Sequence, residues 1–408
     1  MRFSILLPTR DRLNLLKYAI ETVIKQDYAD WEVIVSDNCS NEDVAGYVQS
    51  LADQRIKYYR TDRFLPVTEN WNNALHRSTG DYFIMLGDDD CLMRGCLSAL
   101  HRLINEHNEP DFIYMRAFLY AYPGVFPDSP DGFLQTNGCA PFFVWSDEPF
   151  FLERSVALNV VHMSMDFRLP LEYNMQYSVV KKKFADTLDA PFFQPPYPDY
   201  YATTALFLKG SRILICPTPL VTIGISPKSF GFFYYNDHEE QGVEFLNNLS
   251  VPESLKHLEP LLLPGSNMNT SWLLAMETIR MNYDKESKLR INYRHYRSLQ
   301  VLHLFQRYYQ NPRAFAGLRK ELLGRLSPTE QLWYRMWLNL TGVIAHFFGR
   351  KAVDATLRLL GLESPYPAFV PYRCPSHFQN ILEVFERVTP ELGLAHACKP
   401  QSKTRSGE

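Results

Sequence analysis

The chain lacks several features that would assign it to a well-marked class of protein. Its seven cysteines are an odd number and include no Cys-x-x-Cys pair, which argues against a disulfide framework and a zinc ribbon. It has no uninterrupted apolar stretch of the roughly 20 residues that a membrane-spanning helix needs. It also lacks a basic excess, since the net charge is −3, and this argues against a nucleic-acid partner. We therefore expect a cytoplasmic protein without a secretory signal.

Apolar runs and helical periods alternate through the first 86 residues. A short apolar run predicts a buried strand at residues 3–7, and further strands are expected at 31–37, 55–60 and 82–86. Apolar residues at helical spacing predict three helices between them, at residues 12–26, 44–52 and 69–78. This alternation predicts an α/β fold with right-handed crossovers and a mainly parallel sheet.

The pattern changes twice further along the chain. A helix is expected from residue 91 to 107, a strand at 111–120, loops or a small hairpin at 121–150, and mixed structure to about residue 235. Longer helical patterns follow. We therefore expect an α/β domain at residues 1–235, made of halves 1–95 and 96–235. A mostly helical region at 236–398 and a disordered polar tail at 399–408 complete the prediction.

Polar residues stand where three of the predicted strands end. The strand ends read "LPTRDR", "VSDNCSNED" and "LGDDDC". Ligands of open parallel sheets bind outside the carboxyl ends of the strands, so these segments are expected to form one site. The segment "LPTRDR" contains no glycine, which argues against the Gly-rich phosphate loop of a nucleotidyltransferase.

Two acidic features of this edge have a structural and a functional interpretation each. Asp37 either closes a turn or accepts hydrogen bonds from a nucleotide base or ribose. Asp88, Asp89 and Asp90 either form a solvated loop that caps the next helix or hold a divalent cation, which would relieve their mutual repulsion. One helix cap needs one aspartate, so three in a row favour the cation, Mg²⁺ or Mn²⁺.

The N-terminal segments resemble a known enzyme family. "FSILLPTRDRLNLLKYAIETVIKQDYADWEVIVSDNCSNED" and "ENWNNALHRSTGDYFIMLGDDD" are similar to the family 2 glycosyltransferases of the GT-A fold. The likeness is specific over about residues 1–95 and weaker to about residue 235. It implies inverting transfer of a sugar from a nucleotide diphosphate donor, usually linked to UDP, GDP or dTDP, with the help of a divalent cation. We expect a UDP-sugar as the donor, and a glycan or lipid-linked hydroxyl acceptor in surface polysaccharide or glycan biosynthesis.

The resemblance also implies roles for residues at matching positions. Pro8, Thr9 and Arg12 would line the nucleotide pocket, and Asp37 would contact the base. Asp88 would face the ribose or sugar, while Asp89 and Asp90 would be metal ligands. The family's acidic motif often reads Asp-x-Asp-Asp, and in that register Gly87 stands in place of the first aspartate, so the pair that holds the metal is left open.

Inversion further requires a base on the acceptor side. By family position Asp199, at the start of a helix, would be that base, although an aspartate there is also a common helix cap. Lys228 and Ser229 lie where several members have a loop over the diphosphate. Many relatives carry a metal-binding histidine in this region, and this chain has none between His162 and His238.

Two other functions stay open, a nucleotidyltransferase and a non-catalytic protein that binds sugar nucleotides or glycans. The C-terminal region is expected to serve acceptor contacts, oligomerisation or peripheral membrane attachment. Residues 332–351 are read as an amphipathic helix or a buried hairpin, and as an interfacial helix they would lie at the inner face of a membrane. The transferase prediction requires that Asp37 and the three aspartates share one edge of the sheet.

Overall fold

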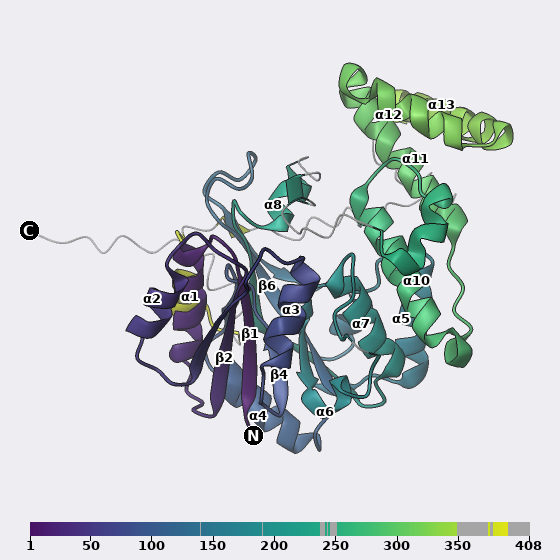
Figure 1. Cartoon of the computed structure of the whole chain (residues 1–408). Coiled ribbons are helices and arrows are strands. Elements are labelled where there is room, and N and C mark those ends of the chain that lie inside the picture. The colour runs from purple at the N-terminus through teal and green to yellow at the C-terminus, as the bar shows by residue number, and fades with distance from the viewer. Residues whose placement is uncertain are drawn as a thin grey trace, which may run out of the picture.

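The computed structural model describes residues 1–138, 140–189, 191–236, 241–242, 244, 251–348, 374–375 and 378–390. A mixed sheet lies at the centre of this part of the chain, with helices packed on both of its faces and a group of helices to one side (Figure 1). The fold class expected from the sequence is confirmed. Among the described residues, no helix combines the length and the apolar character needed to cross a bilayer.

The N-terminal part of the sheet is parallel. In chain order its elements are β1 (Phe3–Thr9), α1 (Leu13–Ile24), β2 (Trp31–Asp37), α2 (Val44–Ser50), β3 (Ile56–Arg60), α3 (Val67–His76) and β4 (Tyr82–Met85). Strand β1 pairs in parallel with β2 and β4, and β2 pairs in parallel with β3. Strands β1, β2 and β4 are buried along almost their whole length, as expected for apolar runs covered by helices on both faces.

The second part of the sheet adds antiparallel strands. Its elements are β5 (Cys91–Leu92), α4 (Cys96–Glu106), β6 (Phe112–Ala121), β7 (Phe133–Asn137), the 3₁₀ turn η1 (Pro141–Val144), β8 (Phe150–Phe151), α5 (Arg154–Met165), the 3₁₀ turn η2 (Met175–Tyr177), β9 (Ser178–Lys181), α6 (Lys182–Ala185), α7 (Pro198–Lys209), β10 (Ile213–Ile225) and α8 (Phe230–Tyr235). Strand β9 lies antiparallel between β4 and β6. Because β9 is antiparallel to both, β6 and its parallel partner β10 run in the direction of β1.

The helix expected from residue 91 begins later. Cys91 and Leu92 form the short strand β5, which pairs with Val221 and Thr222 of β10. Helix α4 starts at Cys96, after Gly95 with a left-handed φ of 74°. The alternative interpretation, in which the aspartate loop caps this helix, does not hold, because five residues separate Asp90 from Cys96 and the cap position is Gly95.

The C-terminal helices form an arm beside the sheet. They are the 3₁₀ segment η3 (Glu253–Leu261), α10 (Asn267–Ser287), α11 (Tyr293–Gln310), α12 (Pro312–Arg325) and α13 (Pro328–Phe348). The buried Trp272 of α10 stacks on Tyr200 of α7 with ring centroids 5.3 Å apart, and its indole N–H donates to the Ser164 carbonyl of α5 at 3.1 Å. Burial of Trp272 thus fixes the base of this group of helices against the rest of the protein. We call residues 267–348 the helical arm.

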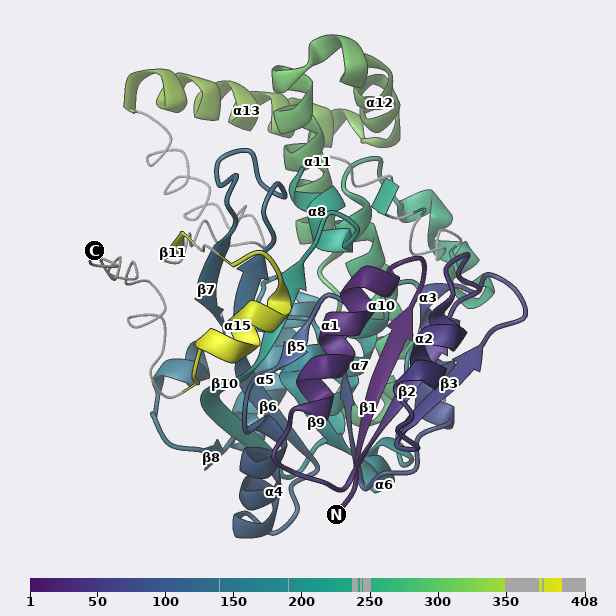
Figure 2. The ribbon, with the colours of Figure 1, turned by 90° about the vertical axis from the view of Figure 1, so that its left-hand side faces the viewer.

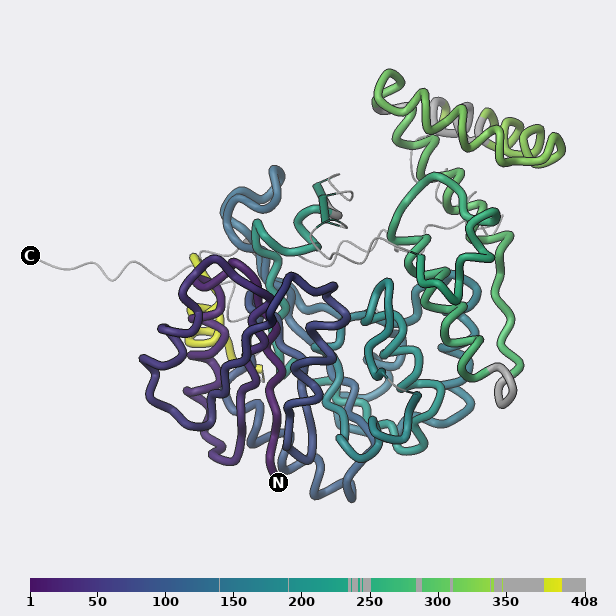
Figure 3. Tube along the Cα trace, in the orientation of Figure 1, coloured from purple at the N-terminus to yellow at the C-terminus, as the bar shows by residue number. Residues whose placement is uncertain are grey.

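The last described segment returns to the sheet. Strand β11 (Cys374–Pro375) pairs with β7, and helix α15 (Ile381–Arg387) packs beside α1. Figure 2 shows α15 in yellow against purple α1, and the trace in Figure 3 shows the same neighbourhood. The sequence placed these residues in the helical region at 236–398. The polar tail at 399–408 lies outside the described residues.

Candidate active site

The carboxyl ends of β1, β2 and β4 meet at one edge of the sheet. Thr9 at the end of β1 is directly opposite Asp37 at the end of β2. The Thr9 hydroxyl donates to Oδ2 of Asp88 at 2.7 Å, so Thr9 is flanked by Asp37 and Asp88. Pro8, half-buried, lies opposite Ser36 on the same strands. The shared edge on which the transferase prediction depends is present.

Asp88 is held in a buried ion pair. Arg12 Nη1 donates to Asp88 Oδ1 at 2.7 Å, and the two side chains are 9% and 3% exposed. The other nitrogen, Arg12 Nη2, donates to the carbonyl of Lys228. Together with Thr9, Arg12 engages both carboxylate oxygens of Asp88.

Asp90 is bound on both oxygens by groups from three parts of the chain. Its Oδ2 accepts the Gly87 N–H at 2.7 Å and the Gln176 side-chain amide at 2.8 Å, and its Oδ1 accepts the Gly224 N–H at 2.8 Å. The side chain is fully buried. These contacts tie the end of β4 to β10 and to η2.

Asp89 has the more open carboxylate of the three. Its Oδ2 accepts the hydroxyl of Ser226 at 2.7 Å. Its Oδ1 lies 3.8 Å from Arg12 Nη1, beyond hydrogen-bond distance. Asp89 is 6% exposed, compared with 2% for Asp88 and 1% for Asp90.

Burial and mutual repulsion shift the acidity of the group. Burial raises the pKa of Asp88, Arg12 opposes that shift and Asp89 adds to it. Burial, reinforced by Asp89, raises the pKa of Asp90 to about 7, against the hydrogen bond from Gly224. Burial would lower the pKa of Arg12, but the carboxylates outweigh it and the pKa is raised. The site therefore holds more negative charge than Arg12 neutralises, a setting in which a further cation is stabilised.

Asp37 is fully buried. Its Oδ1 accepts the Ser40 N–H at 2.9 Å, and its Oδ2 accepts the Tyr58 hydroxyl at 2.7 Å and lies 3.3 Å from Arg60 Nη1. These contacts fit the turn interpretation. Contact between Asp37 and a nucleotide base stays a prediction, with Tyr58 and Arg60 as its immediate neighbours.

The segment after β10 closes over the aspartates. The exposed Lys228 donates from Nζ to the Asp11 carbonyl at 2.6 Å, and so bridges the loops after β10 and β1. Ser229 is the N-cap of α8, since its hydroxyl accepts the Phe232 N–H at 3.3 Å. Phosphate contacts of Lys228 and Ser229 stay predictions.

Asp199 lies in the first turn of α7, with the cap position taken by Tyr197. Its Oδ1 accepts the Met175 N–H at 2.7 Å. Burial raises its pKa to about 7. Asp199 is therefore not the helix cap, and its acidity suits a group that gains and loses a proton near neutral pH.

A short turn connects Asp199 to the aspartate group. Met175 of η2 donates its N–H to Asp199, and the next residue, Gln176, donates its side-chain amide to Asp90. The predicted base and the predicted metal ligands thus contact adjacent residues. Gln176 also has a buried Oε1 that makes no hydrogen bond within the described structure.

No group of three or more His, Cys, Asp or Glu side chains that could hold a metal by itself occurs in the described part of the chain. His162 is exposed in the last turn of α5, and His238 lies outside the described residues. Mg²⁺ commonly uses one or two carboxylates together with substrate phosphates. The Oδ1 of Asp89 fits that mode, whereas Asp88 and Asp90 already have both oxygens engaged.

Three contacts of this site were missed from the sequence: Gly224, Ser226 and Gln176. A Cβ at Gly224 would lie 1.9 Å from the Asp89 carbonyl, so only glycine fits there. Ser226 follows the last residue of β10, and polarity at a strand end was the signal that could have identified it. Gln176 carries no such signal, because η2 precedes its strand.

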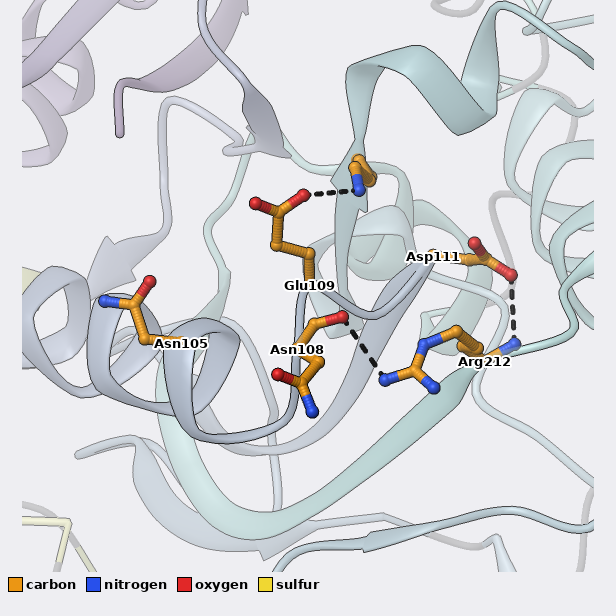
Figure 4. Close-up of a pocket in the computed structure, with 6 residues that line it drawn as sticks. Asn105, Asn108, Glu109, Asp111 and Arg212 are labelled. Carbon is orange, nitrogen blue, oxygen red and sulfur yellow. Dashed lines mark hydrogen bonds and ion pairs between the residues drawn. The ribbon is translucent and has the colours of Figure 1, made fainter.

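A second polar depression lies at the opposite edge of the sheet. Asn105, Asn108, Glu109, Asp111, Lys181 and Arg212 line it (Figure 4). Lys181 pairs with Glu109 at 2.7 Å, and Arg212 donates to the Asn108 carbonyl at 3.2 Å. These contacts join the loops before β6 and β10, which is a structural role remote from the aspartates.

Comparison with known proteins assigns the N-terminal part of the chain. Residues 4–146 match the family model described as glycosyl transferase family 2. This stretch is a family 2 glycosyltransferase domain. It includes Thr9, Arg12, Asp37 and all three aspartates.

Relatives of the family 2 domain come from bacterial glycan pathways. Over 108 residues the chain is 39% identical to a GalNAc(5)-diNAcBac-PP-undecaprenol beta-1,3-glucosyltransferase of Campylobacter jejuni, a match covering 26% of this chain and 35% of that protein. Over 89 residues it is 38% identical to a putative colanic acid biosynthesis glycosyl transferase of Escherichia coli K12, covering 21% and 32%. The matches span about a third of these relatives' length.

Among solved structures, the fold resembles Staphylococcus aureus TarS. The TM-score is 0.43 with 16% identity, covering 80% of this chain and 54% of that chain. TarS 1-349 in complex with UDP-GlcNAc gives a TM-score of 0.42 with 15% identity, covering 80% and 89%. At this level the likeness is too weak to bear on activity.

Proposed function

We propose that the protein transfers a sugar from a nucleotide diphosphate donor, a UDP-sugar above all, to a hydroxyl group of a glycan or lipid-linked acceptor, with inversion at the anomeric carbon. The observation that carries the proposal is the aspartate group at the sheet edge of a family 2 domain, next to Thr9, Arg12 and Asp37. Ligands of open parallel sheets bind at this edge.

The donor would bind across the ends of β1, β2 and β4. Pro8, Thr9 and Arg12 line the nucleotide side, and Asp37 is the residue proposed to select the base. Lys228, exposed over the site, supplies positive charge for the diphosphate, with Ser229 beside it. Arg12 is already paired with Asp88, so its role would be to hold the aspartate loop in position on the nucleotide side of the site.

A divalent cation, Mg²⁺ or Mn²⁺, fits the remaining negative charge. Of the three proposed ligands, Asp89 presents an oxygen without a hydrogen bond in the described structure, while Asp88 and Asp90 would position it. When bound, the cation would stabilise the charge that develops on the leaving diphosphate. The chain's own part is to present Asp89 at a fixed position through Ser226 and the neighbouring aspartates.

Asp199 is the proposed base. As the acceptor oxygen forms its bond to the anomeric carbon, Asp199 takes the hydroxyl proton and the bond to the diphosphate breaks, releasing the nucleoside diphosphate. Its pKa of about 7 leaves a substantial ionised fraction near neutral pH. The single displacement inverts the configuration.

The named relatives support an acceptor class. One is named for a substrate linked to PP-undecaprenol and another for colanic acid biosynthesis. We therefore propose a role in surface polysaccharide or glycan assembly at the cytoplasmic face of a membrane, with peripheral contact through the C-terminal region. Among the residues that the structure describes, Cys39, Cys91, Cys96 and Cys216 are free thiols, which suits a reducing compartment.

The test is release of UDP from a panel of UDP-sugars in the presence of Mn²⁺. Asp89→Asn should lower release by roughly a hundredfold to a thousandfold, as removal of a transition-state charge contact does. The exposed Asp62→Asn is the matched control and should retain activity. Undiminished activity of Asp89→Asn would remove the metal role from Asp89, and binding of a UDP-sugar without any release would favour the non-catalytic alternative.

A further inference from the structure

The helical arm carries an uneven distribution of charge. From α11 to α13, residues 293–348 contain eight Lys and Arg but only two Asp and Glu, in a chain whose net charge is −3. Both acidic residues already pair with arginines: Glu330 with Arg297 at 2.8 Å and Glu321 with Arg325 at 2.7 Å. The surface of α11–α13 is therefore strongly positive beside a more acidic remainder.

Helix α13 also exposes an apolar row. Leu332, Met336 and Leu340 are 64%, 59% and 44% exposed. Their spacing places all three on one face of the helix, which we call the α13 row. On another face, Tyr334 is buried against the arm and donates to or accepts from Ser298 at 3.1 Å. Folding of the arm therefore does not require the α13 row, and its exposure calls for a partner.

The α13 row and the basic residues lie together at one end of the molecule. Figures 1 and 2 agree that α12 and α13 stand clear of the sheet, beyond the end toward which β1 runs. The aspartate group lies at that same end of the sheet, because it follows β4 in register with β1. A surface that contacts α13 would therefore lie on the side of the candidate active site.

We infer that α11–α13 form a docking surface for an anionic lipid bilayer, with the α13 row inserted among the headgroups and the basic residues facing lipid phosphates. An apolar helix face bordered by Arg and aromatic residues is typical of interfacial helices. A second copy fits less well, because it would bring two strongly basic surfaces together. Nucleic acid would leave the exposed Leu332, Met336 and Leu340 side chains without a role.

Docking would place the candidate active site near a membrane-borne acceptor, a consequence that rests on the proposed function. Binding to the membrane does not depend on that function. It is measured on full-length protein without donor or acceptor, by co-sedimentation with vesicles of phosphatidylcholine containing about a third phosphatidylglycerol. We expect binding to these vesicles, little binding to pure phosphatidylcholine, and loss of binding at high salt.

Two sets of variants separate the contributions. Leu332→Gln, Met336→Gln and Leu340→Gln together should lower partitioning at least tenfold, because three exposed apolar side chains no longer leave water. Arg313→Gln, Lys320→Gln and Arg335→Gln together should lower it by about a hundredfold at low salt. Val144→Gln with Leu261→Gln, apolar residues 81% and 45% exposed elsewhere, is the matched control and should bind like the native protein.

Circular dichroism and gel filtration of each variant confirm that the fold is retained. The proposal is overturned if the native protein fails to bind anionic vesicles, or if the Leu332, Met336 and Leu340 variant binds as well as the control. A native protein that is dimeric and does not bind vesicles, together with a monomeric variant, would overturn the proposal and assign the α13 row to self-association. Binding to duplex DNA but not to vesicles would assign the basic residues to nucleic acid. UDP release in solution, assayed separately, reports on the proposed function alone.

Discussion

At the scale of single residues, the buried ion pair of Arg12 and Asp88 links charge to stability. Arg12→Ala would leave Asp88 beside Asp89 without its cation, and breaking a buried pair in this way costs about 3–5 kcal/mol. Urea unfolding measures the loss. The control is Arg63→Ala, because the Arg63 side chain is 73% exposed and its loss should cost little. Equal stability of the two variants would contradict the buried pair.

The raised pKa of Asp199 predicts how activity depends on pH. A base must be ionised, and the pKa of Asp199 is raised to about 7. The rate of transfer should therefore rise as the pH rises toward 7 and level off above it, and Asp199→Asn should lower the rate by roughly a hundredfold or more. Steady-state rates from pH 5 to 9 test this. A profile without a step near 7 would argue against Asp199 as the base.

Asp199 also affects stability. Its folded-state pKa lies above the ordinary value of 3.8, so between about 4 and 7 the folded protein binds a proton that the unfolded chain does not. The stabilisation that proton binding to Asp199 gives the folded state is therefore fully present below that window and is lost as the pH rises through it. Asp199→Asn should flatten this part of the curve of unfolding free energy against pH. An unchanged slope would mean that Asp199 is not buried as described.

At the scale of elements, β10 approaches the Asp89 backbone so closely that Gly224 is required. Gly224→Ala should destabilise the protein and displace Asp89, because its Cβ would lie 1.9 Å from the Asp89 carbonyl. Gly317→Ala in α12, where a Cβ would meet nothing within 4 Å, is the matched control and should stabilise the arm by about 0.5–1 kcal/mol. Thermal unfolding of both variants is the measurement. Equal melting temperatures would contradict the close approach.

The sequence predicted those elements whose signals are local. Strand β2 was expected at residues 31–37 and observed there, because Trp31 and the β-branched residues 33–35 are typical of a buried strand. The meeting of Thr9, Asp37 and Asp88 also followed, since parallel strands end at a common edge. The start of α4 was missed because Cys91 pairs with Thr222, a contact made 131 positions later that no local pattern encodes. Gln176 and Gly224 were missed for the same reason.

At the scale of the whole molecule, Trp272 connects the helical arm to the α7 helix that carries Asp199. Trp272→Ala should cost about 3–5 kcal/mol, because a large buried ring is removed from contact with Tyr200 and Phe167. It should also lower the transfer rate by disturbing the residue next to Asp199. The control is Trp145→Ala, since Trp145 is 56% exposed. Denaturant unfolding and UDP release are both measured. If Trp272→Ala changes neither the stability nor the rate, the helical arm does not support the candidate active site.

The packing of α15 against α1 has a practical consequence for dividing the protein. Ile381, Val384 and Phe385 are buried, and the Tyr120 hydroxyl of β6 donates to the Phe378 carbonyl at 2.7 Å. A fragment that ends at residue 235 would lack α15 and would expose the apolar surface of α1 that α15 covers. We expect such a fragment to aggregate. The α/β domain is therefore not completed by residues 1–235 alone, and a shortened protein would need the segment around α15 as well.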